Sequence, residues 1–351
     1  MDHLFKPDIF STKLPEWTRG SMNSFSGLNT LLNYLPAGFN SEQPLIEYSG
    51  GLEINSSNFK LSVNGESLLL KRWSKSAEKN QVESVLRTMD WLANSEIPVP
   101  KPIKFGDDSF LLQHDGYFWS CYPFVDGEYF SGKGSQISSV ALITAKLTNA
   151  LSKLPPELIP DKGPLHLTDE DDRIIIEIEG LRSKWEVFFG TEYTKILEDS
   201  WELLTNNWHR IRKMRVNPGP ELAVHFDLHP HNMIFNDSQA SAVLDFESCK
   251  VMPVGYALAF AGLKQCRQTI AFHGDTSLAR ETGRIYLNIL SAELERYKPL
   301  TNNFCDLALA EIIRRICIIF RLNISGNKEW NKVLPVQLAH LYEAKALFEN
   351  N

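Results

Sequence analysis

The spacing of apolar and polar residues divides the chain into two regions, and the first of these, residues 44–124, contains mostly short apolar runs. LIEYSGGLEINSSNFKLSV predicts two strands around a glycine-rich turn, and ESLLLKRW predicts a third strand after the Asn64-Gly65 turn. Two more strands are predicted around residues 109–113 and in YFWSCYPF. One helix is predicted over residues 77–94, where apolar side chains recur at helical spacing: Val82, Val85, Leu86, Met89 and Leu92.

The pattern becomes helical after Gly127. Helices are predicted over residues 137–154, over 181–189 continued by 193–207, and at several places between 256 and 348. A single strand pair is predicted in this region, in MIFNDSQASAVLDF. The change of pattern indicates a hinge near residues 122–127.

These patterns predict an α+β protein with two lobes. A small antiparallel β lobe with one helix precedes a larger, mostly helical lobe. The expected division is an N-terminal extension of unknown role (1–45), a small lobe (46–125) and a large lobe (126–351).

The composition is typical of a soluble globular protein, with 43% hydrophobic and 23% charged residues among 351. The formal net charge is −7, and no long basic run occurs, which argues against nucleic-acid binding. No apolar run is long enough for a signal peptide or a membrane span, so we expect no membrane partner. Five scattered cysteines without a CxxC pair favour a reducing, cytoplasmic location.

The strongest chemical signal is HFDLHPHN, from His225 to Asn232, followed by LDFE. Phosphoryl transfer needs an aspartate beside the acceptor hydroxyl and oxygen ligands that hold Mg²⁺ on the phosphates. Asp227 is the candidate base. Asn232 and Asp245 are the candidate metal ligands, since the predicted hairpin between them returns the chain to the same place.

This combination resembles the H-G-D-x-x-x-x-N and D-F/W-x motifs of the aminoglycoside phosphotransferase and choline kinase family, over roughly residues 46–300. The resemblance implies a bilobal protein-kinase-like fold, ATP and Mg²⁺ as cofactors, and transfer of the γ-phosphate to a small-molecule hydroxyl. It also implies that residues 46–125 form the nucleotide-binding lobe and residues 126–351 the catalytic and acceptor-binding lobe. Acceptors in the family include antibiotics, choline, homoserine and sugars. The oligomeric state is not predicted.

Several residues of the small lobe are candidates for nucleotide binding. The segment from Ser49 to Asn58, which includes Gly50 and Gly51, offers backbone N–H groups to phosphates. Lys71 resembles the strand lysine that contacts the α- and β-phosphates in this fold. For the helix glutamate that pairs with this lysine, Glu83 is preferred and Glu78 is the alternative.

The strand that leaves the small lobe resembles the hinge that binds adenine through its backbone. The candidates are Tyr122, Phe124 and Val125, because Pro123 between them has no N–H group. Relatives also carry an aspartate in an Asp-Leu-Ala segment that braces the catalytic loop. Ala257 stands at that position here, which puts the rigidity of the loop in question.

Other interpretations remain open at this level. The residues His225, Asp227, His229 and His231 resemble the ligands of a metallohydrolase, although Pro230 and the following strand pair favour the kinase. A non-catalytic nucleotide-binding module and a Ser/Thr protein kinase are further alternatives. The acidic segment 168–180 is either part of a site for a cationic or polyhydroxyl acceptor or a solvated helix start.

Overall fold

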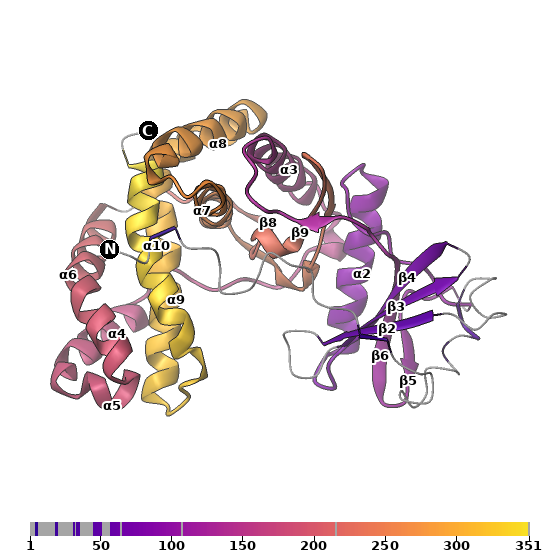
Figure 1. The fold of residues 1–351 in the computed structure, drawn as a ribbon, viewed down its shortest axis with the longest axis horizontal. Coiled ribbons are helices and arrows are strands. Elements are labelled where there is room, and N and C mark those ends of the chain that lie inside the picture. The colour runs from indigo at the N-terminus through magenta and orange to yellow at the C-terminus, as the bar shows by residue number, and fades with distance from the viewer. Residues whose placement is uncertain are drawn as a thin grey trace.

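The structure, a computed structural model, describes residues 4–5, 18–19, 31, 33–35, 45–50, 57–63, 65–106, 108–214 and 216–349. Figure 1 shows a sheet with one helix beside it at one end of the molecule and a larger, mostly helical part at the other end. This is the α+β arrangement that the sequence predicts.

The small lobe is built on a six-stranded sheet in which all neighbouring strands are antiparallel. Its strand order is β1-β2-β3-β4-β6-β5. The strands are β1 (Thr18–Arg19), β2 (Leu45–Gly50), β3 (Ser57–Val63), β4 (Glu66–Arg72), β5 (Leu112–His114) and β6 (Tyr117–Pro123). Five of them match the predicted strands, and β1 adds a short edge strand from the region expected to be an extension.

Helix α2 (Lys79–Asn94) lies between this sheet and the large lobe (Figure 1). Val82, Leu86, Met89 and Leu92 are buried along one face, as their spacing predicts. These side chains belong to the same hydrophobic cluster as the core of the large lobe, whereas the sheet has a separate cluster around Phe59 and Trp119. The helix therefore joins the small lobe to the large one.

The region before residue 45 contributes to both cores. Leu31 and Leu35 are buried in the cluster of the small-lobe sheet. Phe5 is buried in the large-lobe cluster, where its N–H donates to Glu343 Oε1 over 2.6 Å. These described residues are thus integral parts of the packed structure.

The large lobe is mainly helical. Its helices are α3 (Gln136–Leu151), α4 (Asp169–Gly180), α5 (Trp185–Phe189), α6 (Thr191–Met214), α7 (Val254–His273), α8 (Ala279–Glu293), α9 (Phe304–Ile324) and α10 (Leu334–Phe348). The predicted continuation from 181–189 into 193–207 is divided at Gly190, whose φ of 84° ends α5. Within the described residues, no helix is long and apolar enough to span a membrane.

The large lobe contains more strand structure than the single predicted pair. That pair is present as β9 (Met233–Asn236) and β10 (Gln239–Val243), and β7 (Glu128–Tyr129) adds a third strand. A separate pair joins β8 (Glu221–His225) to β11 (Cys249–Pro253). These additional strands are short and pair with distant segments, so the local sequence pattern did not reveal them.

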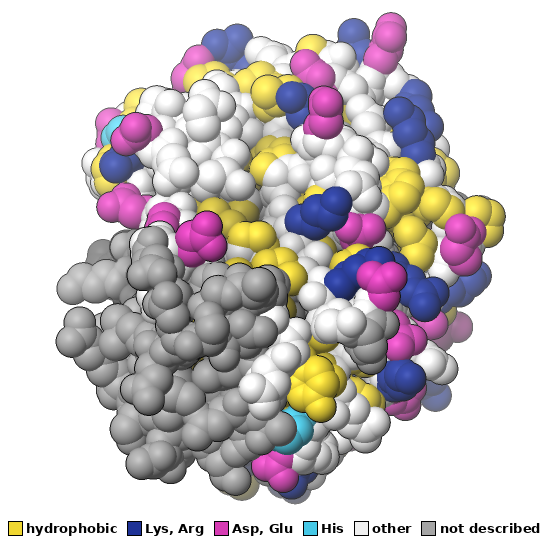
Figure 2. All heavy atoms as spheres, turned by 90° about the vertical axis from the view of Figure 1, so that its right-hand side faces the viewer, with side chains coloured by type: hydrophobic (Ala, Val, Ile, Leu, Met, Phe, Trp, Pro, Cys, Tyr) yellow, Lys and Arg dark blue, Asp and Glu magenta, His cyan; other side chains and the backbone are white. Residues whose placement is uncertain are grey.

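Figure 2 views the molecule from the small-lobe side. On the described part of this face, acidic and basic side chains are interspersed. This distribution is consistent with the modest net charge of −7.

Candidate active site

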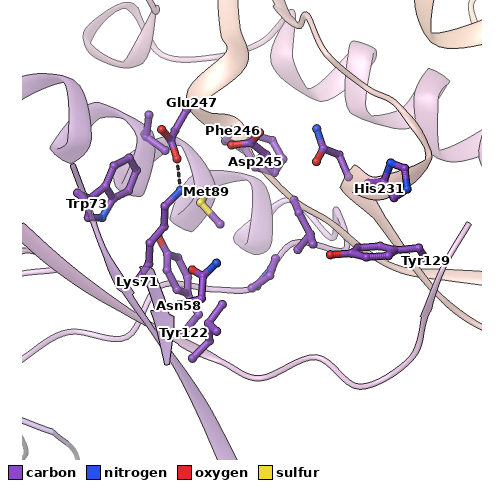
Figure 3. Close-up of a pocket in the computed structure, with 15 residues that line it drawn as sticks. Asn58, Lys71, Trp73, Met89, Tyr122, Tyr129, His231, Asp245, Phe246 and Glu247 are labelled. Carbon is purple, nitrogen blue, oxygen red and sulfur yellow. Dashed lines mark hydrogen bonds and ion pairs between the residues drawn. The ribbon is translucent and has the colours of Figure 1, made fainter. Parts of the chain in front are cut away.

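A pocket of about 270 Å³ lies where the two lobes meet (Figure 3). Asn58 of β3 and Lys71 of β4 line it from the sheet, and Met89 lines it from α2. Asn232 and Asp245 line it from the large lobe. The pocket therefore brings together five side chains from five separate segments, and four of the five were predicted from the sequence.

Lys71 forms an ion pair with Glu247, which is drawn as a dashed line in Figure 3. The ammonium group also lies 4.3 Å from the centre of the Trp73 ring. Burial by itself would lower the pKa of Lys71, but Glu247, together with Tyr122 and Asp245, outweighs burial and raises that pKa above its ordinary value. Lys71 is therefore a fixed positive charge in the pocket.

The partner of Lys71 differs from the prediction, which preferred Glu83 and kept Glu78 as the alternative. Glu83 lies 3.7 Å from Lys79, one turn earlier on the same helix, and Glu78 is the residue that precedes α2. Glu247 is contributed instead by the turn η5 (Phe246–Ser248), which packs against α2. Tertiary packing brought a glutamate from the large lobe to the lysine.

The predicted catalytic loop connects β8 to β9 and is tied to the segment that carries Asp245. His225 Nε2 lies 2.9 Å from the Leu244 carbonyl oxygen, and its Nδ1 lies 3.3 Å from Ser248 Oγ. Burial lowers the pKa of His225, so the ring is neutral at neutral pH. Within the described residues, no group of three or more His, Cys, Asp or Glu side chains is arranged to hold a metal ion.

Asn232 and Asp245 are placed side by side by the β9–β10 hairpin. The Leu244 N–H donates to the Asn232 carbonyl oxygen over 2.9 Å, directly beyond the last strand pair. Asn232 Nδ2 donates to the Asp227 carbonyl oxygen over 2.9 Å, which leaves Oδ1 as an acceptor. Asp245 has a left-handed backbone (φ 62°, ψ 55°), a conformation that aspartate tolerates better than most residues. Amide and carboxylate oxygens together fit Mg²⁺.

The carboxylate of Asp227 is held by two neighbours. Arg315 Nη2 of α9 donates to Oδ1 over 3.2 Å, and His229 Nε2 lies 3.5 Å from Oδ2. Burial would raise the pKa of Asp227, but the positive charge of Arg315, with further contributions from His229 and Lys264, lowers it. The carboxylate is therefore ionised at neutral pH and can accept a proton.

Arg315 was not among the residues predicted from the sequence. It is 88 positions from Asp227, in the segment EIIRRICIIFRL, where charges interrupt an apolar run. Two consecutive arginines inside an otherwise apolar helix were the available signal, since buried arginines are almost always paired.

The predicted phosphate loop is described only in part. Ser49 and Gly50 belong to β2, where they pair with Asn58 and Ser57 of β3. Gly51 lies outside the described residues. Asn58 lines the pocket, in agreement with its predicted position.

At the hinge, the three predicted residues differ in what they offer. The Tyr122 side chain lines the pocket, and burial raises its pKa to about 12, so the phenol stays protonated. The Phe124 N–H donates to the Ser67 carbonyl oxygen over 3.0 Å. In this conformation that N–H completes the sheet and is not free for adenine, which leaves Val125 as the hinge donor candidate.

The acidic segment 168–180 forms α4 (Asp169–Gly180) with its N-cap Thr168, and the four acids of its first turn are bound within the protein. Asp171 closes a capping box with Thr168. Arg212 of α6 contacts both Asp169 and Asp172, at 3.0 and 2.5 Å. Arg321 of α9 lies 3.4 Å from Glu170. The structure favours the helix-start interpretation over a site for a cationic acceptor.

With this geometry in view, comparison with known proteins identifies the family. The model of the phosphotransferase enzyme family matches residues 48–300, more than half of the chain. The chain belongs to this family. Among curated proteins, this phosphotransferase is similar to a homoserine kinase of Chelativorans sp. (strain BNC1), with 24% identity over 277 residues, 78% of this chain and 77% of the relative.

Solved structures share the fold at low sequence identity. A spectinomycin phosphotransferase, solved with ADP and spectinomycin, has a TM-score of 0.61 at 12% identity. The match covers 87% of this chain and 92% of that protein's chain. A microcompartment-associated aminopropanol kinase has a TM-score of 0.57 at 14% identity, with 90% and 94% covered. The choline kinase of Cryptosporidium parvum Iowa II has a TM-score of 0.55 at 15% identity, with 91% and 94% covered.

These comparisons confirm three predictions made from the sequence. The family and the kinase-like fold are those that the motifs around Asp227 and Asp245 indicated. Small-molecule phosphotransferase activity is supported by the family match and by the kinases that the chain resembles.

Proposed function

We propose that this phosphotransferase binds ATP and Mg²⁺ in the pocket between the lobes and transfers the γ-phosphate to a hydroxyl group of a small molecule. The observation that carries the proposal is the common position of Lys71, Asn232 and Asp245 on one pocket. Asn232 also donates a hydrogen bond to the backbone carbonyl of Asp227, the candidate base, which therefore lies next to this candidate metal ligand. The structures that resemble this chain include complexes with ADP and with AMP-PNP and Ca²⁺.

Each residue has a defined role in this proposal. Lys71 contacts the phosphates, while Asn232 Oδ1 and the Asp245 carboxylate hold Mg²⁺, which neutralises charge on the phosphates. Asp227 orients the acceptor hydroxyl and receives its proton. The acceptor oxygen forms a bond to the γ-phosphorus as the bond to the leaving ADP oxygen breaks.

The nucleotide base would lie against the apolar side chains of the pocket, which include Leu69, Met89 and Leu244. Val125 supplies the hinge N–H in this arrangement, and Tyr122 forms part of the wall. Of the segment predicted to cover the phosphates, Asn58 lines the pocket.

The acceptor is a small hydroxyl compound, and homoserine and amino alcohols are the first to test. The reason is the relatedness to a homoserine kinase over 277 residues and the shared fold with an aminopropanol kinase. The acids of α4 are paired with arginines of the same protein, so they provide no argument for a polycationic acceptor.

A Ser/Thr protein kinase is the weaker alternative for a structural reason. Residues 249–253, which follow the Asp245 turn, form strand β11 and pair along their length with β8. The chain then enters α7 at Val254. The segment that presents a peptide substrate in protein kinases is thus replaced here by a strand inside the lobe.

The test is ATP consumption with Mg²⁺ across homoserine, amino alcohols, sugars and aminoglycosides, with Asp227→Asn as the matched variant. We expect turnover on one acceptor class, lowered by roughly 10²–10⁴-fold in the variant because the base is lost. Mg·ATP binding, measured by calorimetry, should be retained. Binding of ATP without turnover on any acceptor would favour the non-catalytic module, and phosphate found only on protein would favour the protein kinase.

A further inference from the structure

We propose that Arg315 and Glu311 of α9 are positioning residues that hold the Asp227 carboxylate and the catalytic loop in the geometry for phosphoryl transfer. The inference rests on the proposed role of Asp227. It concerns two side chains that the sequence motifs do not include.

Arg315 connects two carboxylates at once. Its Nη2 donates to Asp227 Oδ1 over 3.2 Å, and its Nε donates to Glu311 Oε1 over 2.5 Å. A guanidinium group has five N–H donors in a rigid plane, so a bond to one carboxylate fixes the direction of the bond to the other. Through Arg315, the position of Glu311 therefore constrains the orientation of the Asp227 carboxylate.

Glu311 is itself firmly anchored, because it is fully buried and contacts three side chains. Arg314 donates to both of its oxygens over 2.8 Å, and Arg315 donates to Oε1. His166 Nε2, from the connection before α4, lies 2.5 Å from Oε2. The surrounding positive charge overcomes burial and holds the pKa of Glu311 well below its usual range, so this anchor is an ionised carboxylate.

Aromatic rings complete the anchor. The Arg315 guanidinium lies 3.7 Å from the centre of the buried Phe260 ring of α7. Phe226, which precedes the catalytic aspartate, lies 5.3 Å from Arg315 and 5.0 Å from Arg314. His166 stacks on Tyr256 with ring centres 3.7 Å apart. The guanidinium is thus confined from the sides as well as at its hydrogen-bonding edge.

The part of α7 at Ala257 offers no polar side chain to the loop, although Lys264, farther along α7, adds positive charge near Asp227. Ala257 borders the loop residues His225 and Leu228 in a cavity of about 10 Å³. Its methyl group neither donates nor accepts a hydrogen bond. Arg315 of α9 thus donates a hydrogen bond to the Asp227 carboxylate from outside the catalytic loop, while His229 contacts it from within the loop.

Three variants of the full-length protein test the proposal. Arg315→Gln removes both the charge and the planar guanidinium that binds two carboxylates, whereas Arg315→Lys keeps the charge but reaches only one carboxylate at a time. Arg321→Gln is the matched control, because Arg321 lies on the same helix and contacts Glu170 and Asp171 of α4 instead.

The first measurement is amide hydrogen exchange over residues 225–232, which does not require a known acceptor. Arg315→Gln should speed exchange in this loop, Arg315→Lys should speed it less, and Arg321→Gln should leave it unchanged. Mg·ATP affinity should be the same in all variants. Unchanged exchange in folded Arg315→Gln would overturn the proposal, as would acceleration spread evenly over the large lobe.

The second measurement is the separation of kcat from KM with the acceptor that the screen identifies. Arg315→Gln should lower kcat by about 10²-fold with the KM for ATP unchanged, because a misplaced catalytic group slows the chemical step. Arg315→Lys should restore part of kcat. An unchanged kcat in Arg315→Gln would refute the role.

The two measurements separate the possible failures. If the wild type turns over no acceptor, the proposed function fails, while hydrogen exchange still decides whether α9 holds the loop. If Arg315→Gln does not fold, Arg315→Lys decides through the same two measurements, since it preserves the charge beside Glu311.

Discussion

At the scale of single residues, the site is organised as pairs of charges in which one partner comes from a distant part of the chain. Lys71 pairs with Glu247, and Asp227 pairs with Arg315. In each pair the sequence identified the first residue and missed the second. A motif shows which residue type the chemistry needs, but its ionic partner depends on which side chain the fold brings within about 4 Å.

The Lys71–Glu247 pair leads to a prediction about ATP use. Glu247→Gln should lower kcat/KM for ATP by about tenfold, because the lysine loses the charge that holds it in the pocket; the value is modest since both groups are partly exposed. The measurement is steady-state kinetics with ATP varied at saturating acceptor.

Glu83→Gln is the matched control for this variant. Glu83 contacts Lys79 on the surface of α2, so its loss should leave kcat/KM for ATP unchanged. The opposite result, with Glu83 essential and Glu247 dispensable, would mean that Lys71 changes partner when the nucleotide binds. Glu83, the partner predicted from the sequence, would then be the correct one.

At the scale of elements, short β structures place the site. The β9–β10 hairpin starts directly after Asn232 and ends directly before Leu244, and its first and last residues, Met233 and Val243, are paired. The register of this hairpin brings Asn232 and Asp245 to the same pocket. The pairing of β8 with β11 places His225 opposite Cys249, at the start of the catalytic loop.

The hinge contains a glycine whose replacement tests this element. Gly127 has a φ of 143°, and a Cβ added there would lie 2.6 Å from the Phe235 carbonyl oxygen of β9. Gly127→Ala should therefore destabilise the protein by more than the about 1–2 kcal/mol that a left-handed backbone costs, since a strand must also shift. The measurement is the free energy of unfolding in urea.

Gly116→Ala is the corresponding control. Gly116 also has a positive φ, 74°, but nothing lies within 4 Å of an added Cβ. Gly116→Ala should therefore lose only the part of the free energy of unfolding that comes from the positive φ. Equal losses in the two variants would mean that the contact between the hinge and β9 adds nothing.

At the scale of the whole molecule, charged and polar side chains are buried between α7, α9 and α10. His340 of α10 is fully buried, and within the described residues neither ring nitrogen has a hydrogen-bond partner. Burial lowers its pKa well below the ordinary value, and the nearby charges of Lys264, Arg267 and Arg315 lower it further. Glu343, 3.8 Å from Nε2, is the acidic neighbour.

His340 should make the stability of the protein depend on pH. Its pKa is near 6.5 when unfolded and lower when folded, so the unfolded chain binds the extra proton and stability falls as pH drops below 6.5. If the folded ring is still neutral at pH 5, the loss from this group is about 2 kcal/mol there. Urea unfolding of the wild type and His340→Gln between pH 7.5 and pH 5 measures it.

His273→Gln serves as the control in that series, because His273 lies at the exposed end of α7. The difference in stability between wild type and His340→Gln should shrink by about 2 kcal/mol from pH 7.5 to pH 5. A constant difference would show that His340 is protonated in the folded protein as readily as in the unfolded one.

The sequence alone determined the features that depend on local patterns. Alternation and turn residues predicted five strands of the small lobe, helical spacing predicted α2, and the run from His225 to Asn232 with Asp245 indicated the family and its chemistry. These features could be read because each depends on neighbours in the chain or on a motif whose spacing is maintained by one hairpin.

Only the tertiary structure decided the remaining features. The partners of Lys71 and Asp227 are 176 and 88 residues away, the Phe124 N–H is bonded to Ser67 within the sheet, and the acids of α4 are bound by arginines of α6 and α9. The physical reason is the same in each case. Ion pairs and buried hydrogen bonds depend on distance in space, and the packing of helices and strands that sets this distance leaves no periodic trace in the sequence.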